Sequence, residues 1–111
     1  MKRSKRLARG KGLRRASPRR RLEIDLDHHA RLACLMAAGG SCEKCGAWGQ
    51  ALEWHHVITR RVRSLRWLPE NSVALCVPCH RWWHSHPRLA LQWFVARFGE
   101  ARLAFLRSAK P

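Results

Sequence analysis

The sequence predicts one small α+β domain, and three observations support that fold class. The chain has 111 residues, which is enough for a single modest core. Short apolar and partly alternating segments at 51–58 and 73–75 are typical of strands. The segments on either side of these strands repeat apolar residues at spacings of three and four, as amphipathic helices do. A two-stranded unit with helices around it is therefore expected.

The helices follow from spacing and from residues that begin or end them. A first helix is expected from Leu22 until two glycines end the pattern after residue 38. Residues 59–71 are expected to form a basic loop, and a short helix is expected over 78–84, with proline in its first turn. Residues 87–108 predict two further helices separated by a glycine. Three acids lie in the first turns of the first helix, where they suit the positive end of the helix dipole: Glu23, Asp25 and Asp27.

The charge is high and unevenly placed. The formal net charge is +16, which indicates nucleic acid as the first partner to consider and an anionic membrane as the second. Residues 1–21 hold eleven basic residues and no acid, so we expect a disordered tail there and the folded domain over 22–111. We favour an electrostatic arm on a polyanion for this tail over a solubilising or targeting tail.

Several classes are disfavoured by composition. No run of 18 apolar residues exists, so no membrane-spanning helix is expected. The basic start is followed by acids and histidines instead of the apolar stretch of a secretory signal, which favours a cytoplasmic location. Five cysteines, an odd number, then argue for a metal site or free thiols over disulfides.

Four of the cysteines form two pairs with metal-ligand spacing. Cys42 and Cys45 form one Cys-x2-Cys pair, and Cys76 and Cys79 form the other. Two such pairs can converge on one tetrahedral ion, and four thiolates suit a structural Zn²⁺. Unrelated buried thiols and an iron–sulfur site are the alternatives. Cys34 has no partner at this spacing and is expected to be a buried helix residue.

Histidines and one asparagine are interleaved with these pairs. His55 and His56 are adjacent, Asn71 follows, and His80 and His84 lie four apart, where a helix would place them on one face. With the cysteine pairs, this order resembles the HNH endonucleases of the His-Me finger (ββα-metal) group. The resemblance covers residues 42–84. The histidine count is similar to colicin-type nuclease domains, and the four-cysteine site is similar to phage and homing HNH enzymes.

The resemblance implies a ββα-metal core at about 41–86, with zinc knuckles, flanked by an N-terminal helix and two C-terminal helices. It implies that His56 is the general base and that Asn71 either holds the His56 ring or bridges the two β-segments. His55, His80 and His84 would ligate one catalytic divalent ion, and Arg60 would clamp the scissile phosphate. Many relatives have Asp at the position of His55. A histidine there favours Zn²⁺, Ni²⁺ or Mn²⁺ over strict dependence on Mg²⁺.

Other residues are assigned by context. Arginines are expected to form the nucleic-acid-binding surface: Arg60, Arg61, Arg63, Arg66 and Arg81. Trp54 and Trp93 are expected in the core, and one of the adjacent Trp82 and Trp83 is a candidate for stacking on a base. The pair at 28–29 repeats the His-His pattern without a knuckle or a partner asparagine, so it is not expected to be a site.

The sequence therefore predicts a metal-dependent DNA endonuclease that acts as a monomer or homodimer, with RNA as a substrate left open. One alternative is a non-catalytic, zinc-stabilised nucleic-acid-binding module. Another is a nuclease specific for branched DNA in phage recombination or packaging, with phage or bacterial partner proteins. No membrane partner is expected.

Overall fold

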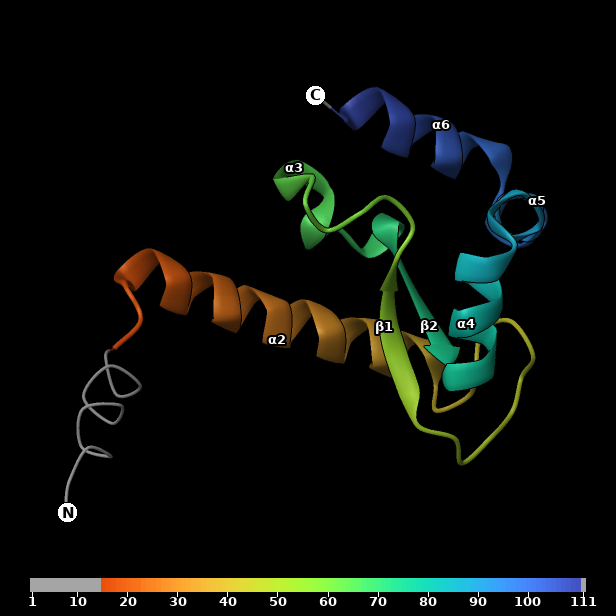
Figure 1. The fold of residues 1–111 in the computed structure, drawn as a ribbon, viewed down its shortest axis with the longest axis horizontal. Coiled ribbons are helices and arrows are strands. Elements are labelled where there is room, and N and C mark those ends of the chain that lie inside the picture. The colour runs from red at the N-terminus through yellow and green to blue at the C-terminus, as the bar shows by residue number, and fades with distance from the viewer. Residues whose placement is uncertain (1–14, 111) are drawn as a thin grey trace, which may run out of the picture.

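The computed structural model describes residues 15–110 of the chain (Figure 1). Its elements in chain order are α2 (Pro18–Ala38), β1 (Leu52–His56), α3 (Arg63–Arg66), the 3-10 turn η1 (Pro69–Asn71), β2 (Ser72–Cys76), α4 (Val77–Ser85), α5 (Pro87–Phe98) and α6 (Glu100–Ala109). Within these residues, no helix is long and apolar enough to cross a membrane. The predicted small α+β fold is confirmed, with an N-terminal helix and two C-terminal helices flanking the ββα unit.

The two strands form an antiparallel pair between helices. Leu52 pairs with Cys76 and His56 pairs with Ser72 at the two ends of the ladder. Both α2 and α4 contact both strands, and every residue of β2 is buried. The sheet is therefore covered on its two faces, and Figure 1 shows β1 and β2 between α2 and α4.

Helix α2 begins earlier than the sequence analysis expected. The Ser17 hydroxyl accepts a hydrogen bond from the backbone N–H of Arg20 at 3.1 Å, and Pro18 occupies the first turn. With this N-cap, residues 18–21 are helical, and α2 starts four residues before the predicted start at Leu22. The helix ends as predicted at Gly39, whose φ of 67° is left-handed. The remainder of the predicted tail, residues 1–14, lies outside the described residues.

The apolar side chains of α2 do not form the core. Leu22 and Met36 are 58% and 77% exposed, and α2 contains no buried residue. The helix instead turns half-buried acids and small residues toward the domain, including Glu23, Asp27 and Ala30. The largest fully buried side chains lie in other elements: Phe94, Leu65, Leu75 and Leu106. Polar contacts must therefore contribute much of the attachment of α2.

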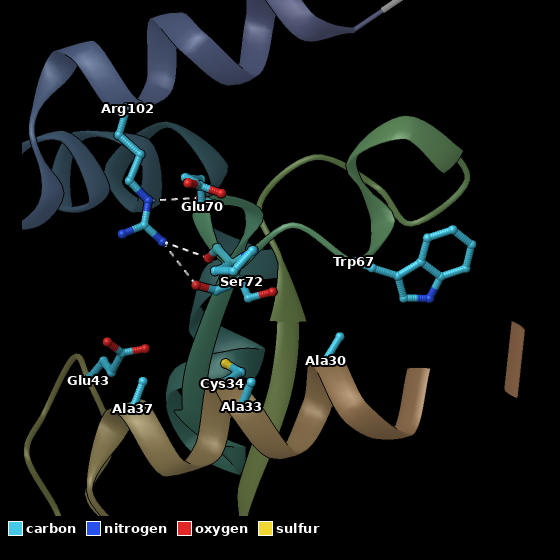
Figure 2. Close-up of a pocket in the computed structure, with 10 residues that line it drawn as sticks. Ala30, Ala33, Cys34, Ala37, Glu43, Trp67, Glu70, Ser72 and Arg102 are labelled. Atoms are coloured by element: carbon cyan, nitrogen blue, oxygen red, sulfur yellow. Dashed lines mark hydrogen bonds between the residues drawn. The ribbon is translucent and has the colours of Figure 1, made fainter. Parts of the chain in front are cut away.

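Helix α6 is fixed to the start of β2 by one arginine. The Arg102 guanidinium donates to the carbonyls of Pro69, Glu70 and Ser72 at 3.1, 2.8 and 3.2 Å (Figure 2). Beside it lies a cavity of about 310 Å³ whose α2 wall consists of small residues, including Cys34. Cys34 is half-buried, and burial raises the pKa of its thiol to about 12.

Candidate active site

The four paired cysteines converge as the sequence predicted. Cys42 and Cys45 lie on a turn closed by the Gly46 N–H on the Cys42 carbonyl at 2.8 Å, Cys76 ends β2, and Cys79 is in the first turns of α4. Their sulfur atoms all lie within 4.8 Å of one another. The Cys45 and Cys76 sulfurs are 3.8 Å apart. Tetrahedral Zn²⁺ with bonds of about 2.3 Å would separate its sulfurs by about 3.8 Å, so the cluster fits zinc.

The thiols of this cluster have different proton affinities. Burial opposes ionisation of Cys42, but hydrogen bonds with the backbone of Cys45, Cys76 and Lys44 outweigh it and lower its pKa to about 6. Burial raises the pKa of Cys76 and Cys79. Zinc must therefore displace protons from some of its ligands when it binds, as is general for thiolate sites.

Three histidines form a second cluster. His55 comes from β1, while His80 and His84 come from one face of α4. One ring nitrogen from each lies within 4.8 Å of the others. Because β1 and α4 are packed together, residues far apart in sequence meet here, as the spacing analysis anticipated.

His55 has the properties of a metal ligand without a protein partner. Its side chain is 3% exposed, and its Nε2 is buried with no hydrogen bond among the described residues. Burial and the neighbouring His80 and His84 lower its pKa to about 3, so the ring is neutral at physiological pH. A neutral, desolvated imidazole nitrogen facing two other imidazoles fits a divalent cation of the Zn²⁺, Ni²⁺ or Mn²⁺ type.

An acid that the sequence analysis did not assign supports this cluster. The Glu53 carboxylate accepts a hydrogen bond from His80 Nδ1 at 2.7 Å, which leaves Nε2 of that ring as the free nitrogen. Carboxylates commonly orient metal-binding histidines in this way. The signal was present in the sequence, because alternation along a strand places Glu53 and His55 on the same face.

His56 points to the opposite face of β1 from His55. Its Nε2 lies 3.0 Å from the backbone oxygen of Arg66, and since a carbonyl only accepts, Nε2 carries the proton and Nδ1 keeps its lone pair. Burial lowers the pKa of His56, assisted by the charges of Arg60 and Arg66 and opposed by the Arg66 carbonyl. The ring is thus neutral, with one nitrogen able to accept a proton.

Asn71 does not touch the His56 ring. Its side chain is fully buried, and its Oδ1 accepts from the Ile58 N–H at 2.7 Å. Its Nδ2 donates to the Ile58 carbonyl at 2.9 Å and to the Leu65 carbonyl at 3.2 Å. Of the two arrangements expected for Asn71, these contacts correspond to the bridge between the β-segments.

The predicted arginine surface divides into two groups. Arg60, Arg61 and Arg81 are exposed, and Arg60 lines the same cleft as the histidines. Arg63 instead pairs with Glu23, and Arg66 is only 8% exposed with its guanidinium on Asp27. Arg66 was therefore wrongly expected on the nucleic-acid surface, because an acid of α2 lies beside it in the fold.

The tryptophans also differ in part from expectation. Trp54 and Trp93 are half-buried, and Trp83 is the one buried among the core residues. Trp83 packs on His55 with ring centroids 4.4 Å apart. Trp82 is half-buried beneath the Lys44 ammonium, 4.2 Å from its ring centroid, so neither of the adjacent pair is freely exposed.

A cleft of about 460 Å³ joins these groups, and its walls include His55, His56, Arg60, His80 and His84. A strand–strand–helix unit with one four-cysteine and one three-histidine cluster has the architecture of a ββα-type domain with two sets of side chains that could each hold a metal ion. Residues 42–86 match the family model described as HNH endonuclease. No curated protein and no solved structure matches the chain significantly. The match to the family model confirms the resemblance inferred from the sequence.

Proposed function

We propose that this protein is a metal-dependent DNA endonuclease that hydrolyses phosphodiester bonds with His56 as the general base. The observation that carries the proposal is the cleft that His56 and the three-histidine cluster share. A nuclease needs a proton acceptor for water and a positive centre for the phosphate, and His56 and the three-histidine cluster both line this one cleft.

The chain's own residues account for the proton transfer. Nδ1 of His56 accepts a proton from the attacking water as the water oxygen bonds to phosphorus. The bond from phosphorus to the 3′ oxygen breaks, and that oxygen leaves with the bonding electron pair and takes up a proton from solvent. The Arg66 carbonyl keeps the Nε2 proton in place, so Nδ1 is the nitrogen that faces the water. The exposed Arg60 at the cleft holds a non-bridging phosphate oxygen.

His55, His80 and His84 would hold the catalytic ion. When bound, a divalent ion supplies Lewis-acid stabilisation of the phosphate and of the leaving 3′ oxygen. Glu53 keeps His80 turned toward the cluster through its hydrogen bond to Nδ1. Three imidazoles favour Zn²⁺, Ni²⁺ or Mn²⁺ over Mg²⁺, which prefers oxygen ligands. The four cysteines hold the structural zinc.

A plasmid-nicking assay tests the proposal. Wild type is compared with His56→Ala in Mg²⁺, Mn²⁺, Ni²⁺ and Zn²⁺, after one tightly bound zinc per chain has been verified. His28→Ala is the matched control, because His28 is an exposed histidine of α2. We expect wild type and His28→Ala to nick with metal, and His56→Ala to lose at least about 100-fold in rate while keeping its zinc and its DNA binding.

The substrate panel decides between the proposed function and its alternatives. Supercoiled, linear and branched DNA are tested beside single-stranded RNA at moderate salt, since a basic chain binds polyanions without specificity at low salt. Preference for branched DNA would support the recombination or packaging role. Binding without cleavage of any substrate with any ion would refute the enzyme and leave a zinc-stabilised binding module.

A further inference from the structure

Asp27, an acid of α2, receives three hydrogen bonds from side chains of the segment that contacts His56. The Asp27 carboxylate accepts two bonds from the Arg66 guanidinium, at 2.9 and 2.6 Å, and one from Trp67 Nε1 at 2.8 Å. These bonds hold the Asp27 pKa below its usual value, so the carboxylate is charged at neutral pH. Bidentate pairing of this kind fixes direction as well as distance.

Arg66 transmits this constraint to the base. The residue whose side chain is held by Asp27 is also the residue whose carbonyl accepts the His56 Nε2 proton. Its side chain is buried, so the guanidinium has no alternative solvated position at low cost. Fixing this side chain therefore restricts where the Arg66 carbonyl can point.

Local structure alone would not hold that carbonyl. Helix α3 has four residues, and no side chain caps its N-terminus. A single helical turn has no stability of its own in water. The turn is held from outside: Glu23, one turn before Asp27 on α2, pairs with Arg63, and Asn71 binds the Leu65 carbonyl. Two acids of α2, Glu23 and Asp27, and the buried amide of Asn71 thus fix α3, whose Arg66 carbonyl contacts His56.

We infer that Asp27 is a positioning residue for His56: it locks Arg66, and the Arg66 carbonyl then selects the ring tautomer and orientation that leave Nδ1 free. The inference rests on the proposed role of His56. It gives α2 a part in the active site although no α2 residue lines the cleft.

The test uses the full-length, zinc-loaded protein with Asp27→Asn. Asp25→Asn is the matched control, because Asp25 is an exposed acid two residues away on α2 with no ion pair in the described part of the chain. The primary readout is ¹⁵N NMR of the histidine rings at pH 7.5, which reports the tautomer of His56 without any need for cleavage. Unfolding midpoint and zinc content are measured beside it.

We expect wild type and Asp25→Asn to hold His56 in the single Nε2–H tautomer. Asp27→Asn should show a mixture that includes the Nδ1–H form, because the Arg66 carbonyl is no longer held in place. With any ion that supports nicking, its kcat should fall about tenfold while KM changes less than twofold. A role confined to stability would lower the unfolding midpoint and leave the tautomer of the folded protein unchanged.

An unchanged His56 tautomer in folded Asp27→Asn would overturn the inference. If Asp27→Asn does not fold, Arg66→Lys takes its place as the test variant. Lysine keeps the charge and the backbone carbonyl but loses the bidentate contact with Asp27. Arg66→Lys must then show the same mixture of His56 tautomers. A wild type that does not cleave, with a tautomer that still depends on Asp27, would refute the proposed function and leave the positioning intact.

Discussion

Removal of the Asn71 side chain should strongly destabilise this domain. It is fully buried and makes three hydrogen bonds, to the N–H and carbonyl of Ile58 and to the carbonyl of Leu65. A net contribution of about 1 kcal/mol for each bond gives a loss of about 3 kcal/mol for Asn71→Ala. In a domain of this size, each kcal/mol shifts Tm by roughly 4–8 °C, so a fall of roughly 12–24 °C is expected.

The assay is thermal unfolding followed by circular dichroism, with zinc in excess so that all variants remain loaded. Ser64→Ala is the control, because Ser64 is exposed on α3. Asn71→Asp should be at least as destabilising as Asn71→Ala, since its carboxylate would face the two carbonyls that now accept from Nδ2. A Tm for Asn71→Ala within a few degrees of wild type would refute the bridge between the segment after β1 and α3.

Two further predictions concern charge and metal. The pKa of Asp27 is lowered from 3.8 in the folded protein, so the stabilisation that the Asp27 carboxylate provides is complete above pH 3.8 and is lost as the pH falls through the folded pKa. The difference in unfolding free energy between wild type and Asp27→Asn, measured by urea titration, should therefore stay constant from pH 7 to 5 and narrow only below about pH 4. A difference that already narrows by pH 5 would contradict this prediction. Removal of zinc by a chelator should unfold the ββα unit, which circular dichroism would report, and should release one zinc per chain, which a colorimetric zinc assay would report. A metal-free sample that keeps the circular dichroism spectrum of the folded protein would contradict a structural zinc.

The sequence predicted the parts of the site that depend on local spacing. The spacing within a Cys-x2-Cys pair or a His-x3-His pair predicts metal ligands, because a turn or a helix fixes the distance between the two side chains. The convergence of Cys42 with Cys76, and of His55 with His80, then required only that two strands and one helix pack together.

The contacts of Asp27 could not be predicted in this way. Asp27 and Arg66 are 39 residues apart in sequence, and neither belongs to a motif. In the sequence, the helix dipole was enough to explain Asp27, and nucleic-acid binding was enough to explain Arg66. Each residue was expected to face solvent, and only the folded arrangement of α2 and α3 brings them together as an ion pair between buried Arg66 and half-buried Asp27.

The two metal clusters are mechanically linked through the first turns of α4. Cys79 and His80 are neighbours there, so a zinc ion on the cysteines would fix the position at which α4 starts and the face that α4 turns to His55. A helix of nine residues is too short to hold that orientation alone. Buried Trp83 supports the same face by packing on His55. A zinc ion on the cysteines would therefore stabilise the fold and also set the geometry of the histidine cluster. Removal of zinc should broaden the histidine-ring signals in NMR before the near-ultraviolet circular dichroism of the core around Phe94 on α5 is lost, and loss of both signals together would contradict this order.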